Sequence, residues 1–231
     1  INGLSGNAVR IFIDGIPITS YGSSFDLNSI PPALIERIEI YKGVIPGYLA
    51  DDALGGAINI VLKKEAKNNF NTSLSYGSFN TAQFNLNGRY RFNKNGFTIK
   101  TSGFINYSDN DYKVWGKNVY NILSNGQYEY VKVRRFNDAF RSTGATVELG
   151  FTDVNSADNF FIGFTTSDAY KEIQHGTFIN TPYKGRFLES DAKLIQITYN
   201  KKDILTEGLD FTFHGIAGER NRTINDTVKW N

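Results

Sequence analysis

The side chains that could carry chemistry are few, because the chain holds only 2 His and no Cys. Asp51 and Asp52 are adjacent, and paired carboxylates can bind a cation or perform acid–base catalysis. No other ligand side chains stand near them in the sequence, so a solvated loop is the favoured interpretation. His175 could bind haem iron or a metal chelate, but residues 1–66 contain no histidine to act with it. The sequence therefore predicts neither a metal site nor a cofactor.

Motifs of covalent chemistry are also missing. Without Cys there is no thiol nucleophile, no zinc–thiolate site and no disulfide framework. The sequence contains no glycine-rich phosphate loop and no Ser–His–Asp set at suitable positions. The formal net charge is only +2, which gives no reason to expect nucleic acid as a partner. We therefore expect a protein that is not an enzyme and that binds no nucleic acid.

From about residue 69 onward, apolar and polar residues alternate. Between Ala82 and Phe92 the even positions are apolar, aromatic or Gly, and the odd positions are polar. A period of two residues is typical of a β-strand with one apolar face. The pattern recurs and predicts seven strands, each near the length that crosses a bilayer at a tilt. The alternating residues that mark these strands lie at 70–77, 81–92, 97–107, 145–151, 160–164, 195–199 and 209–213.

The connections between these strands alternate in length. Residues 93–96 and 154–158 form short turns, whereas residues 109–141 and 170–191 form long polar connections. Short turns on one rim and long extracellular loops on the other are typical of outer-membrane barrels. A mean hydropathy of −0.34 is compatible with such a barrel, because only every second residue faces lipid. A soluble β-sandwich is the alternative, but charges at mid-strand and aromatics near strand ends favour the barrel.

Residues 1–66 have a different organisation and predict a compact mixed α/β segment. Residues 9–13, 38–42 and 57–62 each read as a strand that ends in a turn or in charged residues. The run Ser29-Ile30-Pro31-Pro32 predicts a helix of about two turns that begins at Ala33. We place the domain boundary after this segment, which gives a first domain at residues 1–66 and a second at residues 67–231.

Three segments of the first domain resemble the plug domain of TonB-dependent outer-membrane receptors. They are VRIFIDGIP at residues 9–17, IERIEIYKG at residues 35–43 and GGAINIVLKK at residues 55–64. All three stand in the family's order, directly before the barrel-like strands. The resemblance implies a mixed α/β plug segment followed by antiparallel transmembrane β-barrel strands, in a family that closes its barrel with about 22 strands. Since the chain has no Met, we expect a part of a longer receptor: the C-terminal portion of the plug and about seven barrel strands.

This resemblance also implies a function. Receptors of this family actively import scarce ligands across the outer membrane of Gram-negative bacteria. Their partners are the TonB–ExbB–ExbD complex, whose contact segment is not in this chain, the outer-membrane lipid and the small ligand. An iron–siderophore complex is the leading cargo. Import of a glycan, a peptide or cobalamin by the same mechanism is the alternative, and a structural or adhesive β-protein without transport is a third hypothesis.

The resemblance implies two sets of ligand contacts. At the plug apex they are Tyr48, Asp51 and Asp52. In the extracellular loops they are Tyr112, Trp115 and His175. Tyr48 could instead pack the plug against the barrel wall, and the aromatic side chains of the long loop could fold on themselves rather than stack on a sugar or an aromatic siderophore. Both alternatives stay open at this point.

Charged side chains are the third implied set, because plug charges in this family meet opposite charges on the barrel wall. On the plug they are Arg10, Glu36 and Arg37, and on the wall they are Arg89, Arg91 and Glu148. Pairing of the plug charges within the plug is an equal alternative. The alternation around Arg89 and Arg91 predicts that both point away from lipid.

Overall fold

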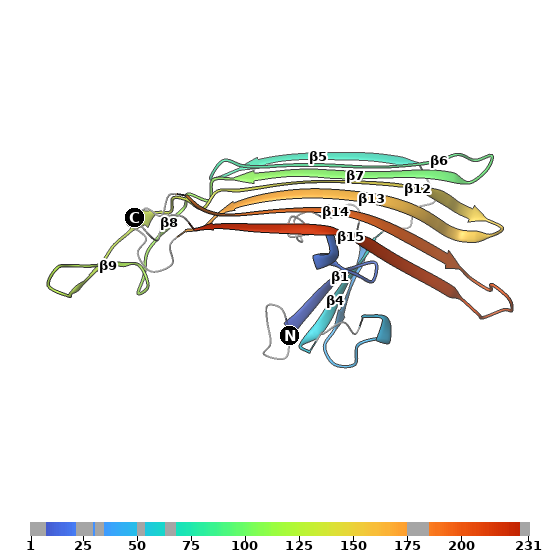
Figure 1. Cartoon of the computed structure of the whole chain (residues 1–231), viewed down its shortest axis with the longest axis horizontal. Coiled ribbons are helices and arrows are strands. Elements are labelled where there is room, and N and C mark those ends of the chain that lie inside the picture. The colour runs from blue at the N-terminus through green and yellow to red at the C-terminus, as the bar shows by residue number, and fades with distance from the viewer. Residues whose placement is uncertain are drawn as a thin grey trace.

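The computed structural model describes residues 8–21, 30, 35–49, 54–62, 68–174 and 185–226. The backbone of these ranges is nearly all β-strand, with the short 3-10 helices η2 (Ile18–Tyr21) and η5 (Gly47–Leu49) and without an α-helix. No helix in this part of the chain has the length and apolarity needed to cross a membrane. Figure 1 shows a small sheet lying on one side of a much larger one.

The small sheet lies in the N-terminal part of the chain and has the strand order β2-β1-β4-β3. Its strands are β1 (Val9–Ile13), β2 (Ile16–Pro17), β3 (Ile35–Tyr41) and β4 (Gly56–Leu62). β1 and β4 are parallel, whereas β1–β2 and β3–β4 are antiparallel. The central strand β4 is apolar at almost every position and largely buried, as expected for a strand covered on both faces.

The turn between β1 and β2 is fastened to β4. Asp14 and Gly15 both have positive φ angles, 47° and 84°, which the sequence Asp-Gly favours. The Asp14 carboxylate accepts a hydrogen bond from the Leu62 backbone N–H, and the Gly15 N–H donates to the Asn59 side chain; each donor–acceptor distance is 3.0 Å. These bonds fix the β1–β2 hairpin on the sheet and thereby set the position of η2, which follows directly.

The prediction of a helix that begins at Ala33 is wrong from Ile35 onward, where the structure describes the chain. Ile35–Tyr41 form β3, which pairs with β4 along its length; residues 33 and 34 lie outside the described ranges. Ile38 and Ile40 are β-branched and alternate with charged residues, which favours a strand. A helix of about two turns is too short to be stable alone, whereas the ladder with β4 satisfies the same backbone groups.

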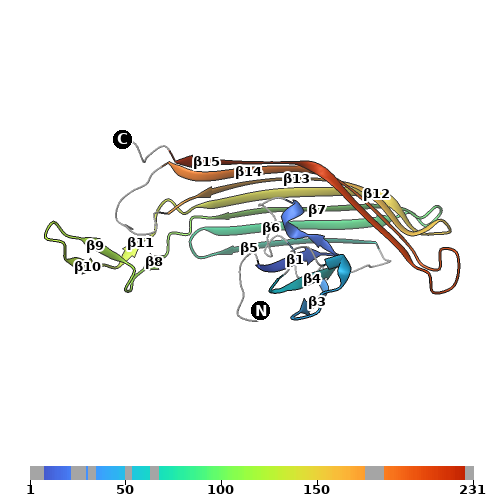
Figure 2. The ribbon, with the colours of Figure 1, turned by 60° about the horizontal axis from the view of Figure 1, so that its bottom comes forward.

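The large sheet contains seven antiparallel strands in the order β15-β14-β13-β12-β7-β6-β5 (Figure 2). Each strand therefore lies beside its predecessor among the long strands. The strands are β5 (Asn69–Gly77), β6 (Thr81–Arg91), β7 (Phe97–Ser108), β12 (Phe140–Val154), β13 (Ala157–Glu172), β14 (Arg186–Lys201) and β15 (Phe211–Asp226).

The later strands are longer than the alternating segments predicted. β13 continues to Glu172 and β14 begins at Arg186, so both ends of the connection expected at residues 170–191 are strand. Likewise β12 begins at Phe140, and the connection before it contains β8 (Lys113–Val114), β9 (Tyr120–Ile122), β10 (Tyr128–Tyr130) and β11 (Val133–Arg134). The sequence hid these extensions because both faces of the strands become polar there, while the backbone ladder continues.

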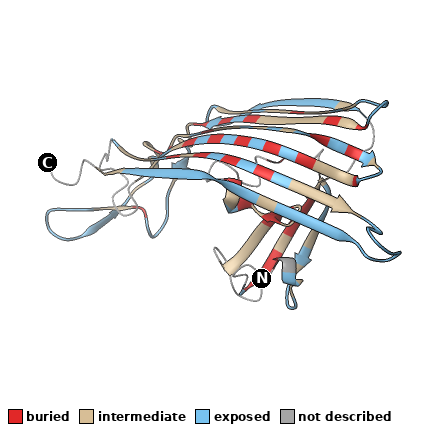
Figure 3. Cartoon of the chain, turned by 45° about the vertical axis from the view of Figure 1, so that its right-hand side comes forward, coloured by how far each residue is buried: buried red, intermediate tan, exposed pale blue. Residues whose placement is uncertain are grey.

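The two faces of the large sheet have opposite polarity, as the alternation predicts. Large apolar side chains on one face are exposed, for example Tyr90 (53%), Leu149 (47%) and Ile162 (49%). On the other face small polar side chains are buried, including Ser142 (0%) and Thr165 (1%). The alternation of buried and exposed residues is visible along β12, β13 and β14 in Figure 3. The polar face is the one toward the small sheet; we call it the inner face, and the other the outer face.

An aromatic row marks one end of the apolar outer face. Phe97, Phe151, Phe160, Tyr199 and Phe213 are paired in register across neighbouring strands, and the rings of Phe97 and Phe151 lie 5.6 Å apart. Such a row at the short-turn ends of the strands is typical of the interfacial girdle of a membrane barrel.

The other limit of the apolar surface crosses the strands obliquely. Phe84 on β6 and Asp168 on β13 stand in one row of paired residues, through Ile105 and Thr143. In this row the outer-face residue of β6 is therefore apolar, whereas that of β13 is charged. Tilted barrel strands require this offset, because a flat membrane plane meets successive strands at different residues.

Candidate functional site

The charged residues expected on the barrel wall all lie on the inner face. The guanidinium of Arg89 donates a 3.4 Å hydrogen bond to Thr152 Oγ1. That of Arg91 donates to the Thr152 carbonyl oxygen from Nε (3.2 Å) and from Nη2 (3.1 Å). Both cations thus bind the wall itself at the short-turn end of β12. Their inward direction agrees with the alternation of β6.

Glu148 lies at the centre of a cluster on the inner face. Its Oε2 atom is 3.7 Å from Lys100 Nζ, and its Oε1 atom accepts a hydrogen bond of 3.1 Å from Gln196 Nε2. Lys100 Nζ also lies 3.6 Å from the centroid of the buried Phe161 ring. The aromatic face and the carboxylate both stabilise the ammonium group. Sequence reasoning did not name Lys100 as a site residue, since its pairing with Glu148 depends on the β7–β12 register.

On the plug, Glu36 and Arg37 pair locally. Arg37 Nη1 lies 2.9 Å from Glu36 Oε1, and Arg37 Nη2 lies 2.8 Å from Glu39 Oε1. Glu39 also accepts hydrogen bonds from Asn59 Nδ2 (2.9 Å) and Tyr41 Oη (3.0 Å). Donation by Asn59, followed by that of Arg37, holds the pKa of Glu39 below its usual value. Of the two alternatives for Glu36 and Arg37, the structure has the pairing within the plug.

Arg10, the remaining plug cation of the expected set, stands on β1 opposite Ala57 of β4 and is half-buried. Its backbone therefore lies in the parallel ladder between β1 and β4.

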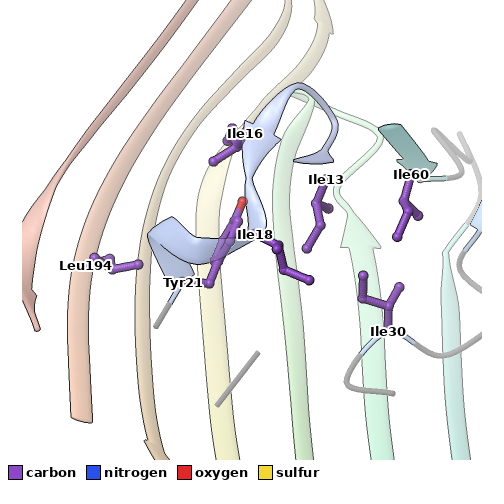
Figure 4. Packing of buried hydrophobic residues seen from close by; sticks show 7 residues of the cluster. All are labelled: Ile13, Ile16, Ile18, Tyr21, Ile30, Ile60 and Leu194. Atoms are coloured by element: carbon purple, nitrogen blue, oxygen red, sulfur yellow. The ribbon is translucent and has the colours of Figure 1, made fainter. Parts of the chain in front are cut away.

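Contact between plug and wall is made through η2. Ile18 and Tyr21 pack in one buried cluster with Leu194 of β14 (Figure 4). Ser167 Oγ donates a 3.0 Å hydrogen bond to the Tyr21 carbonyl oxygen, and the Arg220 guanidinium donates to the Thr19 carbonyl oxygen. Burial, and then the negative charges of Glu148 and Asp14, raise the pKa of the Tyr21 hydroxyl.

No signal in the sequence identified this contact. Ser167 and Tyr21 are 146 residues apart, and the stretch Ile18–Tyr21 is too short to show a period of its own. Only its position, directly after the Asp-Gly hairpin, could have suggested that it projects from the plug sheet.

The expected loop aromatics lie in the connection between β7 and β12. Tyr112 contacts the Phe79 ring edge-on at 5.8 Å and the Arg135 guanidinium at 5.1 Å, so it is part of the base of this connection. Trp115 is 67% exposed, with Lys132 Nζ at 4.8 Å from its ring. The aromatic side chains thus fold partly on one another, as one of the two alternatives had it, and Trp115 keeps most of its surface free for contact.

Further out, β9 and β10 form a hairpin that projects beyond the ends of the long strands (Figures 1 and 2). In this hairpin Tyr130 pairs with Tyr120, and Tyr128 pairs with Ile122. The centroid of the Tyr120 ring lies 4.7 Å from that of Tyr128 and 6.2 Å from that of Tyr130.

The remaining expected contacts are not positioned by the structure. Asp51, Asp52 and His175 lie outside the described residues. Tyr48 belongs to η5, but its side chain is likewise not described. The neighbouring Leu49 is fully buried and packs against Phe12 and Ala57, so the backbone of η5 is anchored in the plug core.

Within the ranges that are described, no three His, Asp or Glu side chains come together in a way that could hold a metal ion. The arrangement consists instead of charged groups paired within the wall and within the plug, and of hydrogen bonds and one apolar cluster between the two. Such a site can bind and release a ligand or the plug itself without covalent chemistry.

Comparison with known proteins agrees with this architecture. Residues 1–57 match the family model of the TonB-dependent receptor plug domain. The chain is similar to the vitamin B12 transporter BtuB of Vibrio vulnificus (strain CMCP6), with 32% identity over 104 residues. The aligned part is 45% of this chain and 17% of the transporter.

Solved receptors share the fold. The ferric-catecholate import receptor Fiu from E. coli K12 superposes with a TM-score of 0.66 and 11% identity, over 95% of this chain and 33% of the receptor. The siderophore receptor PiuA from Acinetobacter baumannii gives a TM-score of 0.63 and 15% identity, over 97% of this chain and 30% of the receptor. This chain spans a third or less of the length of each of these relatives. The match of residues 1–57 to the plug-domain model confirms the resemblance of the three plug segments, and the superpositions confirm the expected fold class.

Proposed function

We propose that this chain, which carries the plug domain of a TonB-dependent receptor and the barrel strands that follow it, takes part in active import of a scarce ligand across the outer membrane of a Gram-negative bacterium. The observation that carries the proposal is the docking of η2 on the polar inner face of a sheet whose outer face is apolar. A plug held by non-covalent contacts inside a membrane barrel can close a pore and can be moved.

Mechanical work from the TonB–ExbB–ExbD complex would displace the plug from the wall, with the proton gradient as its energy source. Among the contacts of η2 with the wall are two hydrogen bonds to its backbone carbonyl groups and one small apolar cluster. Because each such contact contributes on the order of 1 kcal/mol, modest work suffices to break them one after another.

The cargo proposed first is an iron–siderophore complex, because two of the solved receptors with this fold are named for siderophore or ferric-catecholate import. Cobalamin is an alternative by its likeness to the vitamin B12 transporter, and glycan or peptide cargo follows the same mechanism. Tyr48, Asp51 and Asp52 at the plug apex, and Tyr112, Trp115 and His175 in the loops, are the proposed contacts.

An uptake assay tests this function. Cells that carry the full-length receptor are compared with a deletion strain, each with and without TonB, for uptake of radioactive ferric siderophores and labelled cobalamin. We expect uptake that needs both the receptor and TonB. A receptor that reaches the outer membrane but supports no TonB-dependent uptake would leave the structural or adhesive hypothesis.

A further inference from the structure

The apolar part of the outer face shifts along the strands from one edge of the large sheet to the other. On β5 its large apolar residues lie between Phe70 and Tyr76, and the preceding residue of the same alternation, Asn68, is polar. On β15 the last apolar residue of that face toward the long-loop end is Ala217, since Glu219 follows it. Both limits nevertheless fall in one row of paired residues: Phe70, Gly88, Thr101, Val147, Phe164, Ile195 and Ala217.

A flat membrane therefore meets β15 closer to the short turns than it meets β5. A tilted strand crosses the apolar layer in about 9–11 residues. Counted from Ala217 toward the short turns, such an interval reaches Leu209, in the turn between β14 and β15. The outer-face residues on the way are apolar or glycine: Phe211, Phe213 and Gly215. The Phe211 ring lies 5.9 Å from that of Tyr199, so the aromatic row itself extends toward this turn.

The β14–β15 turn differs in composition from the other short turns of this rim. The β6–β7 turn has the sequence NKNG at residues 93–96, and the β12–β13 turn contains Asn155 and Ser156. The β14–β15 turn, at the edge of the sheet far from β5 (Figure 1), carries three large aliphatic side chains: Ile204, Leu205 and Leu209. The aliphatic residues thus occur at the turn that the shifted apolar layer reaches.

Hydrogen bonds hold this turn in a defined conformation. The Ile204 N–H donates a 3.0 Å hydrogen bond to the Leu209 carbonyl oxygen. Asp203 Oδ1 accepts one of 2.6 Å from the Gly208 N–H. Leu205 projects from this bonded turn and is 83% exposed. Removal of such a side chain from water is favourable wherever an apolar phase covers it.

Charge does not account for a membrane contact of this turn. The carboxylates around it outnumber Lys201 and Lys202; they are Asp153, Asp158, Asp203, Glu207 and Asp210. Lys201 Nζ is itself paired with Asp158 Oδ1 at 3.2 Å. An excess of carboxylates repels anionic headgroups, so the favourable contribution to lipid contact is the burial of apolar surface.

We propose that the β14–β15 turn lies in the membrane at the short-turn rim, with Leu205 and Leu209 among the acyl chains, and that its partner is the phospholipid leaflet. The turn then anchors β14 and β15. These strands carry Leu194 and Arg220, which contact η2, so the anchored part of the wall is the part that holds the plug. The inference rests on the membrane placement that the proposed function includes.

The test places a spin label at the tip of the turn in the full-length receptor, reconstituted in vesicles of phosphatidylethanolamine and phosphatidylglycerol. Leu205→Cys supplies the label site, because this chain has no Cys, and any Cys elsewhere in the receptor is replaced by Ser. Since Leu205 is largely exposed, the variant should fold like the parent. The measurement compares collisions of the label with oxygen, which concentrates in lipid, and with a water-soluble nickel chelate.

We expect the label at residue 205 to collide severalfold more with oxygen than with the chelate. The ratio should stay the same when phosphatidylglycerol is left out or the salt concentration is raised, because apolar burial needs no anionic headgroup. Two control sites bracket the result. A label at Asn155→Cys, in the polar β12–β13 turn, should collide mainly with the chelate, and one at Ile162→Cys, on the outer face of β13, should collide mainly with oxygen.

Other outcomes overturn the inference. A label at residue 205 that collides mainly with the chelate, while the label at residue 162 reports lipid, would refute the anchor and leave the membrane barrel standing. A label at residue 205 that neither reagent reaches would show that protein covers the turn instead of lipid. Loss of lipid contact without phosphatidylglycerol or at high salt would refute apolar burial as its cause. If the label at residue 162 is in water, the membrane placement fails, and the inference fails with it.

Discussion

The plug sheet and the wall sheet are built from the same element and bury opposite kinds of residue. In the plug, Phe12 (1% exposed), Ile60 (2%) and Leu49 (0%) form apolar cores. In the wall, the most buried side chains include Thr98, Ser142 and Thr165, whereas large apolar residues are exposed. The plug therefore buries apolar side chains away from water. The wall instead turns apolar side chains outward, toward lipid, and polar side chains inward, toward the barrel interior.

The largest effect is expected in the plug core. Phe12→Ala removes a fully buried ring that packs on Leu49 and Ala57, and such truncations cost about 3–5 kcal/mol. Hydrogen exchange of the full receptor should show faster exchange of the β1 and β4 amides while the wall strands stay protected. Val44→Ala, at a side chain that is 95% exposed, is the control and should change little. Uniform loss of protection in both sheets would mean that plug and wall are one cooperative unit.

On the wall, a charge on the outer face is expected to be nearly as costly. Ile162 lies in the middle of the apolar stretch of β13, and a lysine there should destabilise the barrel by about 2–4 kcal/mol. Thr166→Lys is the matched control, on the same face of the same strand but beyond the apolar stretch. The measurement is the free energy of unfolding from lipid vesicles. Equal losses for both variants would contradict the assignment of the outer face to lipid.

A smaller effect is expected at the plug apex, where the two regions would meet the cargo. Tyr48→Ala should weaken cargo binding by about 1–2 kcal/mol, the usual loss for one aromatic contact. Titration of whole cells with labelled cargo measures the dissociation constant, and immunoblotting of outer membranes measures abundance. A variant that fails to accumulate but binds normally per molecule would show that Tyr48 packs the plug against the wall.

The smallest effect concerns acid. Since hydrogen bonds lower the pKa of Glu39 in the folded plug, its carboxylate stabilises β3–β4 above the pKa of an unfolded glutamate. This contribution is lost as the pH falls through the lower, folded pKa. Exchange of the β3 and β4 amides should therefore accelerate in this acidic range. Glu39→Gln should remove that step, whereas Glu36→Gln should keep it; an identical acid response in both variants would exclude Glu39 as its origin.

Much of the fold follows from local pattern. Strict alternation gave the seven long strands, and it predicted the inward direction of Arg89 and Arg91. The Asp14–Gly15 turn was readable because few other residue pairs adopt positive φ angles so easily. The helix expected from Ala33 failed because pairing with β4 decides the state of Ile35–Tyr41, and that partner begins 15 residues after β3 ends.

By itself the sequence determined the class of the chain, the two-faced strands and the plug segments, since periodicity and turn chemistry act between near neighbours. Only the tertiary structure decided which side chains meet. Lys100 meets Glu148 through the β7–β12 register, and Ser167 meets Tyr21 across 146 residues. These contacts depend on strand register and on plug docking. A shift of one residue in register turns every side chain of a strand to the other face, so no local sequence pattern predicts the contacts.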